Sequence, residues 1–334
     1  MSSVRLFVEP AALTRNASRT VELARRAGCT VAGVTKGVAG HPEVARALLA
    51  GGIEMLADSR LEHLERLRAA GIRAPLLLIR SSAPAAAART VELADASLQS
   101  VVEVVEALSI EARLRGRTHG VILMVDLHTG REGLPAERVP AAARRVASLP
   151  GIRFLGLGAY FSMTSSPELR REGLEALCRL ARRIENETGR PLAVVSGGSS
   201  NIFHALAVDG QPNPGVNHLR IGTAILLGFS SSLEPVTLPG FERDTFRLEA
   251  EVIEVKTGSP PEAILALGTI EVEPRFLFPL QSGVAVREAS SDHLLVRLPG
   301  PARAGDRLSF RLGYPALSRL AASPYVSWEF ARPA

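Results

Sequence analysis

The sequence predicts an α/β fold, a closed barrel of eight parallel strands and eight helices followed by a smaller, mainly β domain. Eight short segments between residues 30 and 227 are apolar on both faces and alternate with helical segments. Such strands are typical of a parallel sheet covered by helices, and eight repeats favour a (β/α)8 TIM barrel. A doubly wound open sheet is the second choice, weakened because no Gly-x-Gly-x-x-Gly follows the first strand. We expect the barrel in residues 1–230 and the β-rich domain in residues 231–334.

The elements of the barrel follow from local patterns. A short strand is expected at residues 6–8. Each helix shows apolar residues at helical spacing, and several have clear ends: Pro42 suits a first turn, and Gly51, Gly71 and Gly116 follow last turns. The predicted barrel strands are residues 30–36, 53–57, 75–79, 94–98, 121–127, 154–161, 192–196 and 217–227. The predicted helices are residues 10–27, 41–50, 59–70, 84–93, 100–115, 136–148, 167–188 and 201–208.

After residue 228 the pattern changes. Residues 246–256 alternate between polar and apolar side chains, and glycine and proline separate the shorter segments that follow. This alternation predicts strands with one buried face. Further strands are expected at residues 263–267, 283–288, 293–298 and 307–312.

Composition excludes several classes of function. The formal charge is +5, but basic and acidic residues are interspersed and aromatic residues make up only 4% of the chain. We therefore expect no nucleic-acid partner. There is no uninterrupted apolar stretch of about eighteen residues and no signal peptide, so no membrane association is expected. Cys29 and Cys178 lack metal-ligand spacing, so we expect no metal site and a cytoplasmic, reducing environment.

Lys36 ends the first predicted barrel strand, where catalytic groups of such barrels gather. Of the 39 Lys and Arg residues, only Lys36 and Lys256 are lysines. Arginine can replace lysine as a surface charge, but its guanidinium stays protonated. A buried amine can lose its proton and form a Schiff base. The sequence therefore favours Lys36 as an amine nucleophile over a plain surface cation.

Other polar groups follow strands at the same end of the barrel. A Gly- and Ser-rich turn at residues 196–201 precedes a helix, and such turns offer backbone N–H groups to an anion. Arg131 follows strand five and Arg220 lies on strand eight, each with a salt bridge at the rim as its alternative role. An amine, a phosphate-binding turn and an arginine facing a ring are what pyridoxal 5′-phosphate (PLP) requires.

These residues resemble the alanine racemase-like (fold-type III) PLP enzymes, most closely their ornithine racemase-like branch. The resemblance covers nearly the whole chain. The matching stretches are Val34-Thr35-Lys36, residues 51–60, residues 122–127, Arg131-Glu132-Gly133, residues 196–200, residues 219–228, residues 290–294 and residues 323–326.

The resemblance implies a homodimeric, PLP-dependent racemase acting on a small-molecule amino acid. Lys36 would form the Schiff base and exchange a proton with the substrate α-carbon. Arg220 would face the pyridine nitrogen, and Arg131 would contact the cofactor's phenolic oxygen or the substrate carboxylate. The residues implied for the phosphate are Ser199, Ser200, Gly222, Thr223 and Tyr325.

A two-base racemase needs a second acid or base on the face opposite Lys36. Between Lys256 and Ala263 this chain lacks the longer segment in which relatives carry that group. Tyr160, His128 and Tyr314 are the remaining candidates, and Tyr160 also occupies the position where relatives often place a ring-packing histidine.

Two other functions share the same cofactor. A fold-type III lyase (aldolase, dehydratase or decarboxylase) is one, and a non-catalytic PLP-binding protein is the other. His293 follows Asp292 near the region where aldolase-like relatives bind a metal, but a structural histidine is the favoured interpretation. Asp58 is the candidate for binding a distal amine of the substrate.

Overall fold

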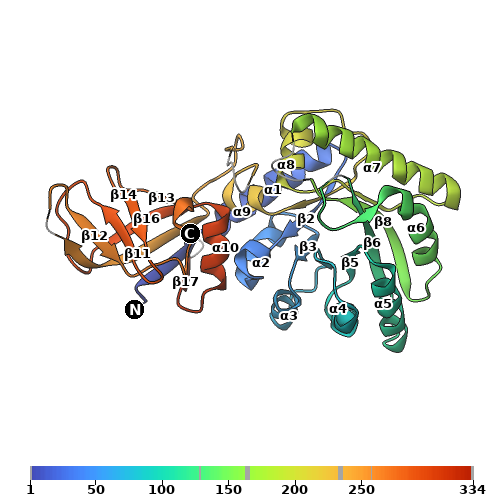
Figure 1. Ribbon diagram of the computed structural model, residues 1–334, viewed down its shortest axis with the longest axis horizontal. Helices are drawn as coiled ribbons and strands as arrows, with labels where there is room; N and C mark the ends of the chain where they lie inside the picture. The colour runs from blue at the N-terminus through green and yellow to red at the C-terminus, as the bar shows by residue number, and fades with distance from the viewer. Residues whose placement is uncertain (1, 128, 162–165, 232–235, 257, 332–334) are drawn as a thin grey trace. The chain divides into compact units, whose positions relative to one another are not determined.

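The computed structural model describes residues 2–127, 129–161, 166–231, 236–256 and 258–331 (Figure 1). Its residues form two compact units. The barrel unit consists of Ala17–Lys36 and Gly40–Gly222, and the sheet unit of Met1–Asn16, Gly37–Ala39 and Thr223–Ala334. The predicted boundary lay after residue 230. The units instead divide after Gly222, and the first sixteen residues belong to the sheet unit because strand β1 (Val4–Val8) pairs there.

The barrel unit confirms the predicted fold class. In the described part of the chain, its parallel strands pair in the order β5-β4-β3-β2-β10-β9-β8-β6, and pairing of β5 with β6 closes the ring. The two-residue strand β7 (Leu134–Pro135) extends the edge of β6. The strands are β2 (Thr30–Val34), β3 (Met55–Asp58), β4 (Leu76–Leu78), β5 (Ala96–Gln99), β6 (His119–Asp126), β8 (Ile152–Ala159), β9 (Val194–Ser196) and β10 (His218–Ile221).

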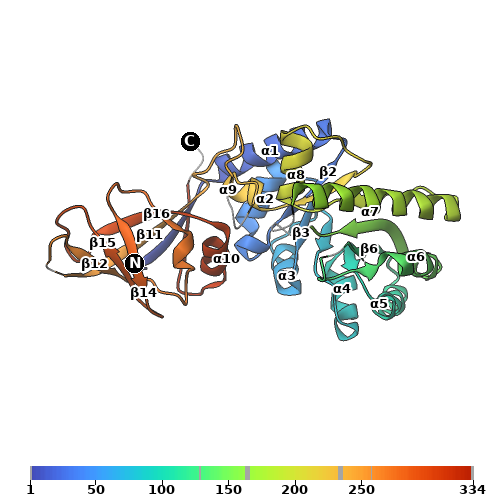
Figure 2. The ribbon, with the colours of Figure 1, turned by 45° about the horizontal axis from the view of Figure 1, so that its top comes forward.

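Helices cover the outside of this ring, as Figures 1 and 2 show for α3 to α7. Their ends follow the expected chemistry: Ser166 caps α7 by accepting the Leu169 N–H at 3.2 Å, and Gly189 ends it at φ +64°. The helices are α1 (Pro10–Arg26), α2 (Pro42–Ala50), α3 (Leu61–Ala69), α4 (Ala87–Leu93), α5 (Val102–Leu114), α6 (Val139–Ala147), α7 (Pro167–Thr188) and α8 (Ser200–Phe203). Residues 17–26 of α1 belong to the barrel unit.

Alternate side chains of the strands fill the barrel. The filling is a cluster of small and medium apolar residues, against which the half-buried Tyr160 packs. This cluster makes the barrel interior a packed apolar core, and the polar groups at the strand ends lie above that core. Its buried members are Ala32, Val34, Ala57, Leu77, Ala96, Leu98, Ile122 and Met124.

Two strand predictions need correction. The predicted strand 217–227 ends at Ile221, and residues Thr223–Leu227 form helix α9 instead. All residues of α9 are buried, and a short apolar run has the same appearance in a buried strand and a buried helix. The predicted strand 30–36 ends at Val34, and Lys36 opens a short 3₁₀ turn, Lys36–Val38.

The sheet unit is an eight-stranded, mostly antiparallel sheet. Its path runs β13-β16-β11-β12-β15-β14, and β1 joins β11 to β17. All of these strands were predicted from the sequence except β13 and β17, although β1 was not expected to pair in this sheet. Helix α10 (Tyr314–Ala322) was not predicted. The strands are β11 (Phe246–Lys256), β12 (Glu262–Leu265), β13 (Leu277–Pro279), β14 (Ala285–Ala289), β15 (Leu294–Arg297), β16 (Arg307–Leu312) and β17 (Ser327–Phe330).

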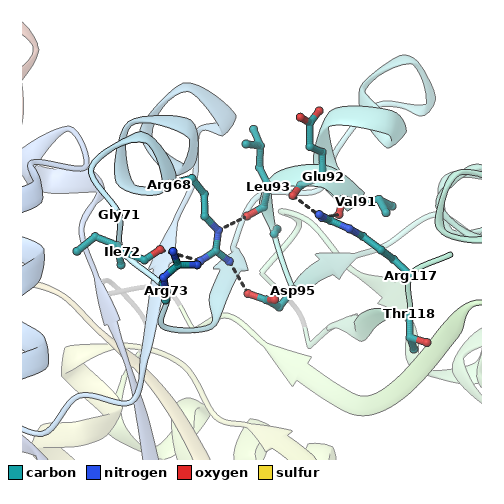
Figure 3. Close-up of a pocket in the computed structure, with 11 residues that line it drawn as sticks. Arg68, Gly71, Ile72, Arg73, Val91, Glu92, Leu93, Asp95, Arg117 and Thr118 are labelled. Atoms are coloured by element: carbon teal, nitrogen blue, oxygen red, sulfur yellow. Dashed lines mark hydrogen bonds and ion pairs between the residues drawn. The ribbon is translucent and has the colours of Figure 1, made fainter. Parts of the chain in front are cut away.

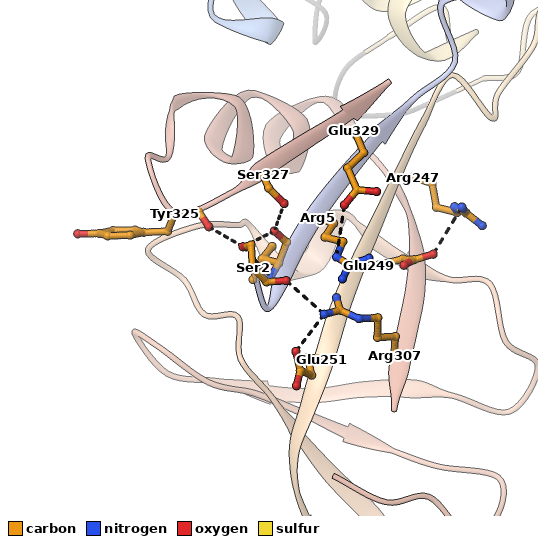
Figure 4. A network of polar contacts seen from close by, with 10 residues as sticks. Ser2, Arg5, Arg247, Glu249, Glu251, Arg307, Tyr325, Ser327 and Glu329 are labelled. Carbon is orange, nitrogen blue, oxygen red and sulfur yellow. Dashed lines mark hydrogen bonds and ion pairs between the residues drawn. The ribbon is translucent and has the colours of Figure 1, made fainter. Parts of the chain in front are cut away.

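A polar network fastens β1 to its neighbours (Figure 4). Arg307 forms an ion pair with Glu251 at 3.0 Å and donates to the carbonyl of Ser2 at 3.2 Å. Arg5 pairs with Glu329 of β17 at 3.4 Å. These contacts hold the first strand between β11 and β17.

None of the helices that the structure describes is long and apolar enough to cross a membrane.

Candidate active site

Lys36 lies in a tight loop at the carboxyl end of β2. The Thr35 N–H donates to the carbonyl of Ala57 at 2.9 Å, and the Thr35 carbonyl accepts from Gly40 N–H at 3.2 Å. Between them Ala39 has φ +49°, a left-handed conformation that costs a side-chain-bearing residue free energy. The chain thus closes on itself around Lys36 and fixes where the lysine side chain starts.

A buried carboxylate supports this loop. Asp58, at the end of β3, has no solvent-exposed surface. Its Oδ2 accepts from the Thr35 hydroxyl at 2.7 Å, and its Oδ1 accepts from the N–H groups of Ser59 at 2.6 Å and Arg60 at 3.1 Å. Oδ1 also lies 2.9 Å from Nδ1 of His63. Asp58 is therefore committed to the loop, which corrects the prediction that it binds a distal amine of the substrate.

The surroundings of Lys36 favour its neutral amine. The Lys36 side chain is exposed, yet the protein around its amine displaces enough water that desolvation is the largest cause of its lowered pKa. The positive charges of Arg131 and Arg220 lower the pKa of Lys36 further, while Asp58 and Glu132 act in the opposite direction. A lysine with a lowered pKa is a better nucleophile near neutral pH.

Arg220 is buried on β10, 7% exposed, and its guanidinium is held from two sides. One nitrogen, Nη1, donates to Oγ of Ser196, and Nη2 donates to the carbonyl of Ala159 at 2.8 Å. Burial lowers the pKa of Arg220 to about 10, so it still carries its charge at neutral pH. Ser196 also lies 2.8 Å from Nδ1 of His218, another buried residue that the sequence analysis did not single out.

Arg131 and Tyr160 form a second pair at the strand ends. The Arg131 guanidinium carbon lies 4.0 Å above the centre of the Tyr160 ring, a cation–π contact. The loop that carries Arg131 is pinned because Asp126 Oδ1 accepts from the Thr129 N–H at 2.9 Å and from the Gly130 N–H at 3.2 Å. Oε1 of Glu132 lies 3.5 Å from Nη2 of Arg131, and the negative charge of Glu132 acts to raise the pKa of both Lys36 and Arg220. Glu132 was not among the residues predicted for the site.

The Gly-Ser turn runs beside β10. Gly197 N–H donates to the carbonyl of His218 at 3.0 Å, and Arg220 N–H donates to the carbonyl of Gly198 at 2.8 Å. A side chain at Gly197 would come within 2.7 Å of Val216, so the close approach of the two segments requires glycine. This pairing brings the half-buried Ser199 and the buried Ser200 to the end of the barrel where β10 finishes at Ile221.

The remaining predicted site residues are Gly222 of the barrel unit, three residues of the sheet unit and one that lies outside the described chain. Gly222 follows β10, and a Cβ there would lie 3.2 Å from Val34. Thr223 opens α9 in the sheet unit. Tyr325, also in the sheet unit, is 68% exposed, and its carbonyl accepts from the Ser2 hydroxyl at 3.2 Å while its ring points away from the network (Figure 4). His128 lies outside the described residues. Tyr314 begins α10.

A cavity of about 680 Å³ lies at the opposite end of the strands (Figure 3). Two of its arginines donate to backbone carbonyls: Arg68 to Ile72 at 3.0 Å and Leu93 at 3.2 Å, and Arg117 to Glu92 at 2.7 Å. These contacts satisfy backbone carbonyl groups at or just after the ends of α3 and α4. Across the described ranges, no group of three or more His, Cys, Asp or Glu residues could hold a metal ion.

The residues of the barrel end fit a pyridoxal-type cofactor. The set contains an amine with a lowered pKa at Lys36, a buried and charged Arg220, and a Gly-Ser turn beside the same strand. These are an imine-forming group, a partner for a ring nitrogen and donors for a phosphate.

Comparisons with known proteins agree with this arrangement. Residues 8–228 match the family model described as alanine racemase, N-terminal domain. The chain is 31% identical to the lysine racemase of Thermotoga maritima over 96% of its own length and 97% of that protein. It is 28% identical to the ornithine racemase of Acetoanaerobium sticklandii over 95% of its length and 96% of that protein.

Solved structures share the fold. The alanine racemase of the D-cycloserine-producing Streptomyces lavendulae superimposes with a TM-score of 0.81 at 20% identity, over 100% of this chain and 98% of that one. Likeness at this identity concerns architecture, whereas the sequence relationships above concern the family. The chain therefore belongs to the alanine racemase N-terminal domain family, in its lysine and ornithine racemase-like branch, and is an amino-acid racemase.

Proposed function

We propose that this racemase binds PLP at the carboxyl end of its barrel, with Lys36 as the residue that holds the cofactor covalently. The observation that carries the proposal is the lowered pKa of Lys36 in a loop fixed by buried Asp58. When bound, the cofactor withdraws electrons from the substrate and so acidifies its α-carbon hydrogen. The Lys36 amine, whose pKa is lowered mainly by desolvation, would take or return that proton on one face.

The other residues have supporting roles in this proposal. Buried Arg220 presents a permanent charge to the ring of the cofactor, and Arg131 binds the carboxylate of the substrate or the phenolic oxygen. Ser199, Ser200, Gly222 and Thr223 are the proposed phosphate ligands, with Tyr325 as a further one. Tyr160 is the proposed second acid or base, with His128 and Tyr314 as the alternatives.

The test uses the fact that the chain has two lysines. Purified protein is incubated with PLP and reduced with borohydride, and the pyridoxyl group is located by peptide mass mapping. We expect the label on Lys36 in the wild type and in Lys256→Arg, and loss of the label and of racemisation in Lys36→Arg. A label that stays in Lys36→Arg would refute the assignment.

We further propose basic amino acids as substrates. Two relatives that match nearly the whole chain in sequence are named for lysine and ornithine. Glu132 supplies a negative charge near Lys36 and Arg220, and it is not committed to backbone groups as Asp58 is. An ammonium at the end of the substrate side chain is the complement of that carboxylate.

Chiral chromatography of single enantiomers tests this substrate class. Incubated with PLP-loaded protein, lysine and ornithine should be racemised faster than alanine, and deuterium from D₂O should enter the α-position. Glu132→Gln should raise KM for the basic substrates about tenfold, the value of one charge-assisted hydrogen bond, and leave alanine nearly unchanged. Equal losses for all substrates would remove Glu132 from side-chain recognition. Release of an aldehyde, ammonia or carbon dioxide would instead indicate a lyase.

The proposed assembly is a homodimer. Several large apolar side chains of the sheet unit are exposed, among them Ile270 at 55% and Phe278 at 40%. Light scattering of the eluted protein should give twice the mass of 35.5 kDa.

A cytoplasmic location is also proposed, because Cys29 and Cys178 are both free thiols, as in a reducing compartment.

A further inference from the structure

Three buried polar side chains form a line across two neighbouring strands of the barrel. Ser196 ends β9 and lies directly opposite His218 of β10 in the parallel register. Arg220 is two residues further along β10, so His218 and Arg220 point to the same side of that strand. Arg220 pairs in register with Ala32, a member of the cluster that fills the barrel. The line therefore lies on the inner side of the barrel wall.

The hydrogen-bonding capacity of each group gives the line a direction. A guanidinium only donates, so Oγ of Ser196 accepts from Arg220. The serine hydrogen is then directed to Nδ1 of His218, 2.8 Å away, provided that this nitrogen is unprotonated. Burial and the charge of Arg220 lower the pKa of His218 to about 3, so the ring is neutral. A neutral ring carries a single proton, and the direction that we infer for these hydrogen bonds puts it on Nε2, so that Nδ1 accepts from Ser196.

This line leaves Arg220 little freedom. One side of its guanidinium is fixed by the Ala159 carbonyl at 2.8 Å and the other by Ser196. The serine oxygen is fixed in turn by His218. We infer that Ser196 and His218 are positioning residues that set the orientation of the Arg220 guanidinium at the proposed cofactor site. This inference rests on the proposed function.

The barrel contains a matched control. Ser97 of β5 and His119 of β6 form another buried serine–histidine pair, with Oγ 2.8 Å from Nε2, and Ser97 accepts from the Gln99 amide at 2.9 Å. That pair has the same chemistry but a neutral donor in place of Arg220. Variants of Ser97 therefore report what a buried serine–histidine bond is worth to the fold alone.

The first measurement determines the protonation state and tautomer of His218 in protein without cofactor. Nitrogen chemical shifts of ¹⁵N-histidine-labelled protein, assigned with His218→Asn, should show His218 neutral with the proton on Nε2 across the physiological pH range. In Ser196→Ala this tautomer preference should be lost. A charged ring, or a proton on Nδ1, would overturn the inferred direction of the hydrogen bonds.

The second measurement is cofactor affinity with the visible spectrum of the bound cofactor. Ser196→Ala and His218→Leu should weaken PLP binding about tenfold and shift the absorbance band, because Arg220 loses a fixed partner. His218→Asn, which keeps an accepting oxygen, should recover most of the affinity. Ser97→Ala should lower thermal stability and leave both cofactor readouts unchanged.

The outcomes separate this inference from the proposed function. If Ser196→Ala lowers stability but changes neither affinity nor spectrum, as expected for Ser97→Ala, the pair is structural and the inference fails alone. If the wild type takes up no PLP and Lys36 is not labelled, the proposed function fails and this inference fails with it. The histidine tautomer would then still report whether the hydrogen bonds themselves exist.

Discussion

Replacing Asp58 by asparagine should destabilise the barrel without changing its shape. The side chain makes four contacts: with the Thr35 hydroxyl at 2.7 Å, the N–H groups of Ser59 at 2.6 Å and Arg60 at 3.1 Å, and His63 at 2.9 Å. Hydrogen bonds to a charged group are worth about 1 kcal/mol more than neutral ones, so Asp58→Asn should lower the free energy of unfolding by about 2–4 kcal/mol. Asp58→Ala, which also leaves the donors without an acceptor, should cost about 3–5 kcal/mol.

The assay is urea-induced unfolding followed by far-ultraviolet circular dichroism, with borohydride labelling of Lys36 as a second readout because Thr35 precedes it. Thr35→Val removes one partner, and its effect should not add to that of Asp58→Asn, since both break the same bond. Asp306→Asn is the control: this carboxylate accepts from the Arg303 N–H at 2.9 Å but is partly exposed, and its loss should cost less than about 1 kcal/mol. If Asp58→Asn costs no more than Asp306→Asn, Asp58 does not support the lysine loop.

Three further predictions concern the barrel. Gly156→Ala would place a Cβ 1.9 Å from the carbonyl oxygen of Val194 and should destabilise the protein by at least about 3 kcal/mol. Gly116→Ala, at φ +60° in open space, should cost only about 1–2 kcal/mol. Equal unfolding midpoints of the two variants would contradict this prediction. Burial lowers the pKa of His119 from 6.5 to about 4, so the folded state resists protonation. As the pH drops from about 6.5 to about 4, His119 should contribute up to about 3 kcal/mol to the loss of stability, and buried His218, whose pKa is lowered to about 3, should add to that loss. His119→Gln should therefore make this part of the pH profile shallower by the share of His119, and an unchanged slope would contradict the prediction. Burial raises the pKa of Cys29 and Cys178 to about 11, so a thiolate-selective reagent should label neither in the native protein and both in urea; rapid native labelling would show that the thiols are accessible.

The barrel could be predicted from sequence because its strands differ locally from everything around them. A parallel strand buried on both faces is an unbroken apolar run, and residues 120–125 of β6 have that form. Helix α9 could not be predicted, because residues 223–227 are an equally apolar run and only their tertiary surroundings select a helix. Strand β1 was recognised, but its partners β11 and β17 come from the far end of the chain.

The candidate site divides in the same way. Lys36, Arg131 and Arg220 could be named from sequence because each is a polar residue at or beside a strand end. His218 and Ser196 could not, because their contact depends on the register between β9 and β10. The sequence marked Asp58 as polar and close to Lys36, but only burial and its four contacts show that it serves the loop and not the substrate.

The pairing of β1 with β11 has a consequence for the order in which the protein can be made. Val4 pairs with Ala250 and Leu6 with Leu248, so about 240 residues separate the two partners along the chain. At a synthesis rate of about 5–20 residues per second, the first strand waits roughly 12–50 s for its neighbour to be made. Apart from the closing pair of β2 with β10, the barrel strands pair with their neighbours in sequence and can assemble during that interval. An early-emerging β-strand with unpaired edges must therefore be kept from association, by a chaperone or by its own shortness, until the last part of the chain arrives.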